Sequence, residues 1–367
     1  MEGFFLFVSV FLVSIISHGS SFLHVLPYHH QSRTRTIRTF RLFLHVKPPS
    51  PDETPGNVMI FGNGNVGKAV LSCIESGVAL RSNNTIYCTF TKSPPPDKIA
   101  GVEYIQFNQT TNVLQRCSHV LITIPPIMKD DNYNFTDPIL DNPRIFSSIP
   151  KNAWIGYVST TGVYGNHNGE WVNESSLTLC KPGTKARAYL DIERRWHAFQ
   201  NTSTIFRCGG LYGENVSALH TVRKGRGGDW SRQLGNGNMN ENGKEEGVTS
   251  RIHLVDVGRA IVAGMKQSQS MNGVFNLADS LPAARSEVMH YAYNLLLDSN
   301  VTPEKHDANV QGSERRRRRG KDRKRVSNQK MLHLLEKDYG GKLLFPSYRA
   351  GLQHVLSKNL CEWKSTG

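Results

Sequence analysis

Apolar residues gather in short runs that alternate with helical patterns along most of the chain. Residues 58–61 (VMIF) are four consecutive apolar residues, which predicts a buried parallel strand. The segment that follows has helical spacing of its apolar residues, and so has 185–200. Further strands are predicted at 85–91, 102–105, 119–124, 154–158, 204–207 and 274–278, and a further helix at 286–297. Repeated alternation of strand and helix predicts an α/β fold with a doubly wound parallel sheet.

The segment 235–247 (GNGNMNENGKEEG) interrupts this alternation. It is rich in glycine and asparagine and lacks apolar periodicity, which predicts a flexible surface insertion without chemistry of its own. Regular structure resumes at 251–255, where Asp256 is placed to cap a helix that runs through Gly264.

A G-x-G-x-x-G pattern joins the first predicted strand to the first predicted helix. In a dinucleotide site the first glycine permits the tight turn, the second lets the backbone approach a pyrophosphate, and the third lets the helix pack closely on the strand. The helix N-terminus then offers unpaired N–H groups to the phosphate. We therefore predict a Rossmann site for a nicotinamide dinucleotide. Its predicted cofactor-binding residues are Gly62, Asn63, Gly64, Asn65, Val66 and Gly67.

The choice of dinucleotide depends on the end of the second predicted strand. An acidic residue there favours NAD through the ribose 2′-hydroxyl, whereas a cation accommodates the 2′-phosphate of NADP. This chain has Lys92 at that point and no acid before Asp97, so NADP is predicted and NAD remains the alternative. Thr123, Ile124 and Pro125 end the fourth strand and are expected to flank the cofactor crevice, because open α/β sheets bind ligands at this edge.

The net charge of +14 is concentrated in two segments. Residues 1–50 carry +4 and residues 314–325 carry +7, so the rest of the chain carries only +3. The basic run has almost no apolar residue and cannot offset the entropy of its own ordering. We expect a solvated, disordered insertion at 312–325. Contact with nucleic-acid phosphates is the less favoured alternative, since no aromatic residues are interleaved for base stacking.

The N-terminal segment has the composition of a targeting leader. Its apolar run at 4–16 is too short for a confident membrane span and fits the core of a signal peptide. The stretch from 3 to 51 has no Asp or Glu but recurring Arg, Ser and Thr, as transit peptides have. This two-part leader resembles that of algae with secondary plastids and favours a plastid over a mitochondrion or the secretory pathway. A proline-rich linker then leads into the folded chain, for which no membrane span is expected.

The length of 367 residues allows one large domain and a small lobe. We predict a leader and linker at 1–55, a dinucleotide-binding domain at 56–280 and a C-terminal α/β substrate lobe at 281–367. The six cysteines are scattered, without C-x-x-C spacing or clustered histidines, so the sequence indicates neither a metal site nor a disulfide framework. Several lie within apolar patterns, where a free cysteine behaves as a small hydrophobe.

Several motifs match one family in the same order. They include GNGNVG at 62–67, ITIPP at 122–126, VSTTGVYG at 158–165, ERRW at 193–196, FRCGGLYG at 206–213, RIHLVDVGRAI at 251–261 and FNLADSLPAARSEV at 275–288. Over residues 57–355 the chain resembles an atypical member of the extended short-chain dehydrogenase/reductase superfamily, of the NAD-dependent epimerase/dehydratase type. The resemblance implies a Rossmann fold with a C-terminal substrate lobe.

The resemblance also assigns candidate catalytic residues. Family enzymes carry a Ser or Thr four residues before the tyrosine of the V-Y-G block, which is Thr160 here. Its hydroxyl would stabilise a substrate carbonyl or alkoxide, and a backbone-bonded threonine at a strand end is the alternative. The family's Y-x-x-x-K acid/base pair is absent: Lys185 stands where the tyrosine belongs and Tyr189 where the lysine belongs. A swapped pair and Tyr164 are the remaining candidates, with a packed aromatic as the alternative role of Tyr164.

Two functions follow from these expectations. The first is an NAD(P)-binding oxidoreductase or epimerase that acts on a small hydroxyl or carbonyl compound, nucleotide sugars included. The second is a catalytically weak or inactive NADP-binding module with a structural or regulatory role, in which 314–325 contacts RNA. The sequence leaves the substrate and the oligomeric state open.

Overall fold

The structure is a computed structural model that describes residues 56–75, 84–131, 133–200, 203–226, 247–268, 271–304 and 323–365. The leader at 1–55, the insertion at 235–246 and most of the basic run at 314–325 lie outside these residues, so the predictions made for them stay predictions. The described residues belong to one compact unit that begins at Pro55, and the proposed boundary at 280 also stays a prediction. No helix among the described residues combines the length and the apolar character needed to cross a membrane.

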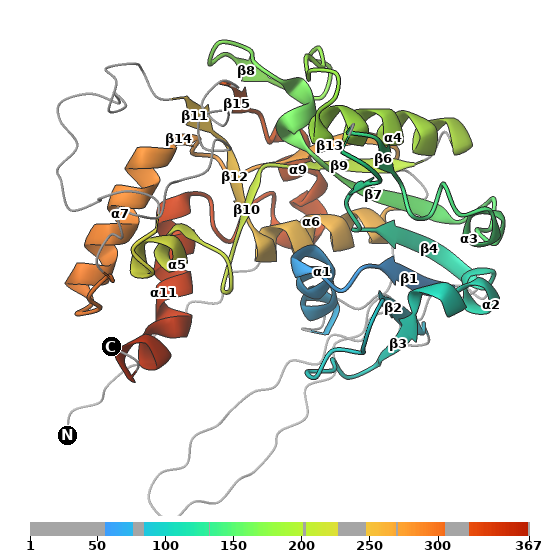
Figure 1. The fold of residues 1–367 in the computed structure, drawn as a ribbon, viewed down its shortest axis with the longest axis horizontal. Coiled ribbons are helices and arrows are strands. Elements are labelled where there is room, and N and C mark those ends of the chain that lie inside the picture. Colours follow the sequence, from blue (N-terminus) through green and yellow to red (C-terminus); the bar gives the residue numbers. More distant parts are fainter. Residues whose placement is uncertain are drawn as a thin grey trace, which may run out of the picture. The chain divides into compact units, whose positions relative to one another are not determined.

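A seven-stranded sheet forms the centre of the molecule (Figure 1). Its spatial order is β13-β9-β7-β4-β1-β2-β3, and every neighbouring pair is parallel. The strands are β1 (Asn57–Phe61), β2 (Ile86–Phe90), β3 (Val102–Gln106), β4 (Cys117–Ile122), β7 (Trp154–Thr160), β9 (Thr204–Cys208) and β13 (Gly273–Leu277). The reversal of strand order beside β1 is the feature that creates a crevice in doubly wound sheets, and the predicted fold class is confirmed.

Helices cover both faces of this sheet, which explains why its strands are continuous apolar runs. In β1, Val58 and Ile60 join the apolar cluster of α1 (Asn65–Glu75) and α6 (Leu254–Lys266). Met59 and Phe61 point the other way, into the cluster of α2 (Thr111–Leu114), α3 (Pro143–Ser147) and α4 (Lys185–Phe199). Cys73, Cys88, Cys117 and Cys208 are buried in these layers, as predicted for small hydrophobes.

A third apolar cluster lies outside the sheet and combines α5 (Ala218–Arg223), α7 (Arg285–Asp298) and α11 (Tyr348–Ser365). In Figure 1 these helices gather on one side of the molecule, away from β1 to β3. α9 (Gln329–Leu334) packs against α6, and α10 (Glu336–Tyr339) follows it in the chain; Met331 and Leu334 of α9 join the cluster of α1 and α6. The C-terminal segment therefore contributes to two cores.

Four short strand pairs lie outside the central sheet in the described chain. They are β10 (Gly210–Tyr212) with β12 (Arg251–His253), β11 (Val248–Thr249) with β14 (Ala283–Ala284), β8 (Trp171–Val172) with β15 (Arg325–Val326), and β5 (Ile127–Met128) with β6 (Phe135–Thr136). The first pair is parallel and continues from the end of β9, so it extends the carboxyl edge of the sheet towards the C-terminal helices.

The start of α6 differs from the prediction. Asp256 does not cap the helix, because α6 begins at Leu254 and the Nδ1 atom of His253 accepts the N–H of Val255 at 3.2 Å. Asp256 is fully buried in the first turn and accepts the backbone N–H groups of Leu344 and Phe345, each at 2.8 Å. The carboxylate therefore fixes a distant segment of the chain rather than its own helix.

Candidate cofactor and active site

The glycine turn between β1 and α1 is held by hydroxyl groups from two neighbouring strands. Gly62 has a φ of 107°, a conformation that favours glycine, and its N–H donates to the hydroxyl of Thr89 at 2.9 Å. On the other side, the hydroxyl of Thr123 donates to the carbonyl of Phe61 at 2.9 Å and lies 3.1 Å from that of Gly62. The turn is thus anchored at the switch point of the sheet.

The three glycines of the turn have different steric surroundings. A Cβ atom on Gly67 would lie 2.0 Å from the carbonyl oxygen of Gly62, and one on Gly62 would lie 2.6 Å from the hydroxyl of Thr123. A Cβ atom on Gly64 would meet nothing within 4 Å in the described part of the chain. Gly62 and Gly67 therefore permit the turn and the close packing of α1, whereas the protein itself does not require a glycine at position 64.

The other predicted cofactor residues lie around this turn. Val66 faces the core, and Asn63 and Asn65 lie at the exposed N-terminal end of α1. Lys92 is exposed in the turn after β2 and forms no ion pair among the described residues. Ile124 is half-buried and Pro125 exposed directly after β4, on the strand neighbouring β1. All of them except Val66 therefore lie along the carboxyl edge of the sheet.

A cavity of about 740 Å³ runs along α1 from the glycine turn. Asn63, Asn65 and Lys68 line it on the side of α1, and Arg259 of α6 and Tyr104 of β3 line its flanks. Lys92, Thr123 and Thr160 do not line it, so it adjoins the glycine turn without following the whole carboxyl edge. Its volume is in the range of small-molecule sites.

Thr160 ends β7 beside the turn of the V-Y-G block. Its hydroxyl oxygen accepts the N–H of Gly162 at 3.1 Å and so caps the short 3₁₀ helix Thr161–Tyr164. The side chain is half-buried, and its hydroxyl donates to no group in the described part of the chain. The Thr160 hydroxyl therefore accepts a backbone hydrogen bond, as in the alternative role, and can still donate its own proton to a ligand oxygen at the carboxyl edge.

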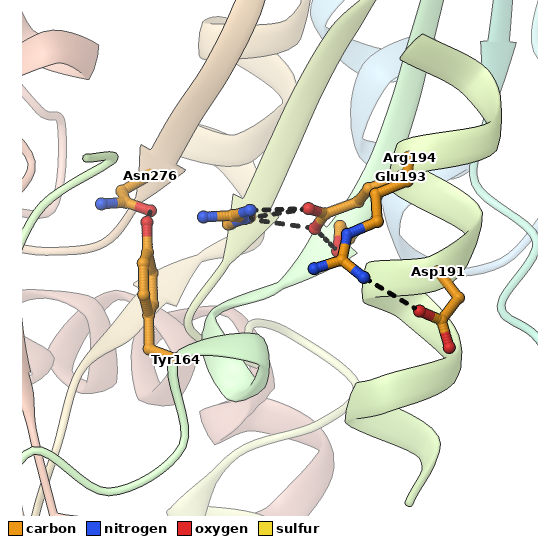
Figure 2. Close-up of polar contacts among 7 residues, drawn as sticks. Tyr164, Asp191, Glu193, Arg194 and Asn276 are labelled. Atoms are coloured by element: carbon orange, nitrogen blue, oxygen red, sulfur yellow. Dashed lines mark hydrogen bonds and ion pairs between the residues drawn. The ribbon is translucent and has the colours of Figure 1, made fainter. Parts of the chain in front are cut away.

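Tyr164 is fully buried beneath this edge. Its hydroxyl donates to the side-chain oxygen of Asn276 at 2.7 Å, a contact visible in Figure 2, and the guanidinium of Arg207 lies 4.9 Å from its ring centre. Burial raises the pKa of this phenol. The structure thus places Tyr164 as a packed aromatic residue with an occupied hydroxyl, away from solvent.

Lys185 and Tyr189 both lie in the first turns of α4, but no hydrogen bond joins them. Lys185 is exposed, whereas Tyr189 packs among the apolar residues of two clusters. Burial, followed by the nearby thiol of Cys208, raises the pKa of Tyr189 to about 12. An acid/base tyrosine needs a lowered pKa, so these positions do not support the swapped pair, which stays a hypothesis.

A buried ion pair that the sequence did not reveal lies beside Thr160. Glu193 of α4 and Arg207 of β9 have side chains only 5% and 6% exposed. Their contacts are bidentate, with Nε to Oε1 at 3.1 Å and Nη2 to Oε2 at 2.7 Å, and the hydroxyl of Ser159 also donates to Glu193. The dashed lines at Glu193 in Figure 2 mark these contacts. The pair ties α4 to the ends of β7 and β9.

The sequence does contain a signal for this pair. Glu193 falls three residues after Leu190 and three before Trp196, on the face of α4 that is otherwise apolar. A carboxylate on an apolar helix face requires a buried partner. On the opposite face Asp191 pairs with Arg194 at 3.5 Å, which is the ordinary surface arrangement (Figure 2).

The sheet and its helices define an α/β protein of the doubly wound class, with the glycine turn at the edge where such folds bind their ligands. No protein-family model matches the sequence, and no curated protein matches it significantly. Solved structures do match. A conserved protein of unknown function from Silicibacter pomeroyi is 22% identical, with a TM-score of 0.60 over 83% of this chain and 99% of that chain.

Two further matching structures were solved with a cofactor. The UDP-glucose 4-epimerase of Thermus thermophilus, solved with NAD, is 16% identical, with a TM-score of 0.56 over 82% of this chain and 98% of that one. The human epimerase family protein SDR39U1, solved with NADPH, is 15% identical, with a TM-score of 0.54 over 82% and 99%. These likenesses show the fold. The chain has a Rossmann-type, doubly wound α/β fold, as its sequence predicted.

Proposed function

We propose that the protein binds NADP(H) and acts as an oxidoreductase or epimerase on a small hydroxyl or carbonyl compound. The observation that carries the proposal is the open position at Gly64. Gly62 and Gly67 are glycines because the protein's own atoms leave no room, but nothing in the described chain limits residue 64. A ligand whose phosphates approach the backbone there accounts for the glycine at position 64.

The surroundings of the turn support a nicotinamide dinucleotide. Asn63, Asn65 and the N-terminal N–H groups of α1 would face the pyrophosphate, and Thr123 to Pro125 would border the nicotinamide side. Lys92, exposed and without a carboxylate partner in the described part of the chain, suits the 2′-phosphate of NADP. Structures with the same fold were solved with NAD or with NADPH, so NAD is the alternative.

The chemistry proposed for the protein's own residues is modest. A bound nicotinamide supplies hydride transfer, and Thr160 would donate a hydrogen bond to the oxygen on which charge develops. The Glu193–Arg207 pair would hold the ends of β7 and β9 on either side of that oxygen. A sugar nucleotide is one candidate within the class of hydroxyl compounds.

A second function is favoured by the two phenols. Tyr164 and Tyr189 have raised pKa values, and neither is placed to exchange a proton with a bound substrate. A module that binds the cofactor with little or no turnover therefore remains the alternative. The RNA contact suggested for 314–325 belongs to this alternative and stays a hypothesis.

Nucleotide titration of the full chain tests the proposal. We expect NADPH to bind at least tenfold more tightly than NADH, and Lys92→Asp to remove this preference because a carboxylate repels the 2′-phosphate. Lys98→Asp, an exposed lysine of the same loop, is the matched control and should change nothing.

Turnover then separates the two functions. A panel of sugar nucleotides and small carbonyl compounds is assayed with the preferred nucleotide. Turnover that falls at least tenfold in Thr160→Ala supports the enzyme, whereas nucleotide binding with no turnover across the panel supports the module. Equal binding of NADPH and NADH, unaffected by Lys92→Asp, contradicts the NADP assignment.

A further inference from the structure

Arg251 lies at the carboxyl edge of the sheet, close in topology to Thr160. Thr160 is paired with Cys208 at the ends of β7 and β9. Two residues later Gly210 is paired with Arg251 of β12, and the N–H of Asp279, just beyond β13, donates to the carbonyl of Arg251. Arg251 therefore follows the ends of β9 and β13 at the edge where open α/β sheets bind their ligands.

The guanidinium of Arg251 is fixed through one nitrogen. Its Nη1 atom donates to the carbonyl of Thr249 at 2.8 Å and to that of Ala283 at 2.9 Å, which uses both protons of this nitrogen. These two carbonyls belong to β11 and β14, which pair with each other. The orientation of the guanidinium is thus set by a small sheet rather than by a flexible side chain.

The other edge of this guanidinium has no partner. Nε and Nη2 form no hydrogen bond, and Arg251 forms no ion pair, within the part of the chain that the structure describes. Arg251 is half-buried, and neither nitrogen is among the fully buried polar atoms that lack a hydrogen-bond partner in the described chain. In Arg207 the same Nε and Nη2 edge binds both oxygens of Glu193. Arg251 presents this edge unoccupied.

The space beside Arg251 is kept open by a glycine. Gly210 is exposed, and a Cβ atom added to it would lie 3.6 Å from the Cγ atom of Arg251. A side chain at this position would therefore begin to cover the arginine stem. The stem of Arg251 thus lies beside an exposed stretch of backbone at Gly210.

The charges around Arg251 leave it available to an anion. Burial lowers its pKa, and the carboxyl groups of Asp279 and Glu287 act in the opposite direction. Glu287 is already occupied by the hydroxyl of Tyr348 at 2.6 Å and by Arg349 at 3.1 Å. Asp279 is 1% exposed, and burial raises its pKa to about 7, so its negative charge is weakened near neutral pH.

We propose that the Nε and Nη2 edge of Arg251 binds an oxyanion of the substrate, a carboxylate or a phosphate, in a bidentate contact. The identity of this ligand as substrate rests on the proposed function. The substrate of the site is then an anionic hydroxyl or carbonyl compound, held at one end by Arg251 with its reacting oxygen near Thr160. Arg251 is a binding residue that determines specificity.

Calorimetric titration of the full chain with two probes tests the proposal. Sodium malonate represents the carboxylate and inorganic phosphate the phosphate, each measured with and without saturating NADPH, at ionic strength held constant with chloride. We expect saturable binding of at least one probe by the wild-type chain. Arg251→Lys keeps the positive charge but loses the two parallel N–H donors of the guanidinium. The affinity of this variant for the probe should fall at least tenfold, with its NADPH affinity unchanged.

Two variants guard against a trivial result. Arg144→Lys, an exposed arginine of α3, is the matched control and should bind the probe as the wild type does. Arg251→Gln provides a second change, and circular dichroism verifies the folding of each variant. The proposal is overturned if neither probe saturates the wild-type chain, or if a folded Arg251 variant keeps wild-type affinity. Failure of NADPH to bind, with Arg251-dependent probe binding retained, overturns the proposed function alone.

Discussion

Hydroxyl and carboxyl groups outside the glycine motif hold the backbone of the candidate site in place. The glycine spacing predicted the turn at Gly62, because only local geometry is involved. The contributions of Thr89 and Thr123 depend on the pairing of β1 with both of its neighbours, which no local pattern specifies. In the same way Glu193 was visible as a motif residue, but its partner Arg207 is known only once α4 packs on β9.

Asp279 is a residue whose ionisation should limit stability. It is 1% exposed, and neither carboxylate oxygen has a hydrogen-bond partner of normal geometry in the described structure. Burial raises its pKa to about 7, against an ordinary value of 3.8, and the charge of Arg251 offsets only part of this effect. The folded state therefore holds the proton more tightly than the unfolded state. This contribution to stability is complete below pH 3.8 and is lost as the pH rises to about 7.

Asp279→Asn removes this titration. The neutral amide resembles the protonated acid and does not titrate. Between about pH 4 and pH 7 the free energy of unfolding of the variant should therefore rise relative to that of the wild type. The gain is at most about 1.4 kcal/mol for each pH unit, and it should level off above pH 7. Urea unfolding at several pH values measures it, with exposed Asp298→Asn as control. A difference between Asp279→Asn and wild type that does not vary with pH contradicts this account.

At the scale of elements, the strands and long helices follow from the sequence because their apolar patterns are strong. β1, β2, β4, β7, β9 and β13 all lie within about two residues of their predicted positions. The start of α6 was wrong because an aspartate at 256 has the chemistry of a cap, whereas the actual cap is a histidine three residues earlier. The Asp256 carboxylate instead accepts the backbone N–H groups of Leu344 and Phe345, a distant contact that no local sequence pattern predicts.

The contact between α1 and α6 offers a test at this scale. Gly258 of α6 is buried against α1, and a Cβ atom there would lie 2.5 Å from the carbonyl oxygen of Ala69. Gly258→Ala should therefore destabilise the protein by about 1–3 kcal/mol, even though alanine is the better helix former. Thermal unfolding measures the loss, and NADPH affinity should fall with it because α1 carries the glycine turn. Gly64→Ala, where an added Cβ meets nothing, is the control for stability alone and should unfold at the wild-type temperature. A Gly258→Ala variant as stable as the wild type would contradict this expectation, because it would mean that α1 and α6 can move apart without a loss of stability.

At the scale of the whole molecule, residues 56–365 belong to one α/β unit in which the C-terminal segment helps to hold Arg251 through the carbonyl of Ala283. Charge and composition indicated a globular body with local basic segments, and the resemblance indicated a lobe after 280. The composition of that lobe was not predictable, because α5 lies before the boundary and yet shares a core with α7 and α11. The apolar patterns of these helices do not specify which other helices they pack against. The packing alone shows which residues of β12 and β14 lie at the carboxyl edge.

Gly64 is expected to be a glycine because a bound dinucleotide, and not the protein itself, needs the space beside its backbone. The direct measurement is an NADPH titration of the wild-type chain and of Gly64→Ala, with the thermal unfolding of both recorded in the absence of nucleotide. We predict the same unfolding temperature for the two proteins and at least a tenfold loss of NADPH affinity in the variant, because its methyl group would occupy the approach to the pyrophosphate. Equal NADPH affinity in the two proteins, or no binding of NADPH by the wild-type chain, would contradict the account.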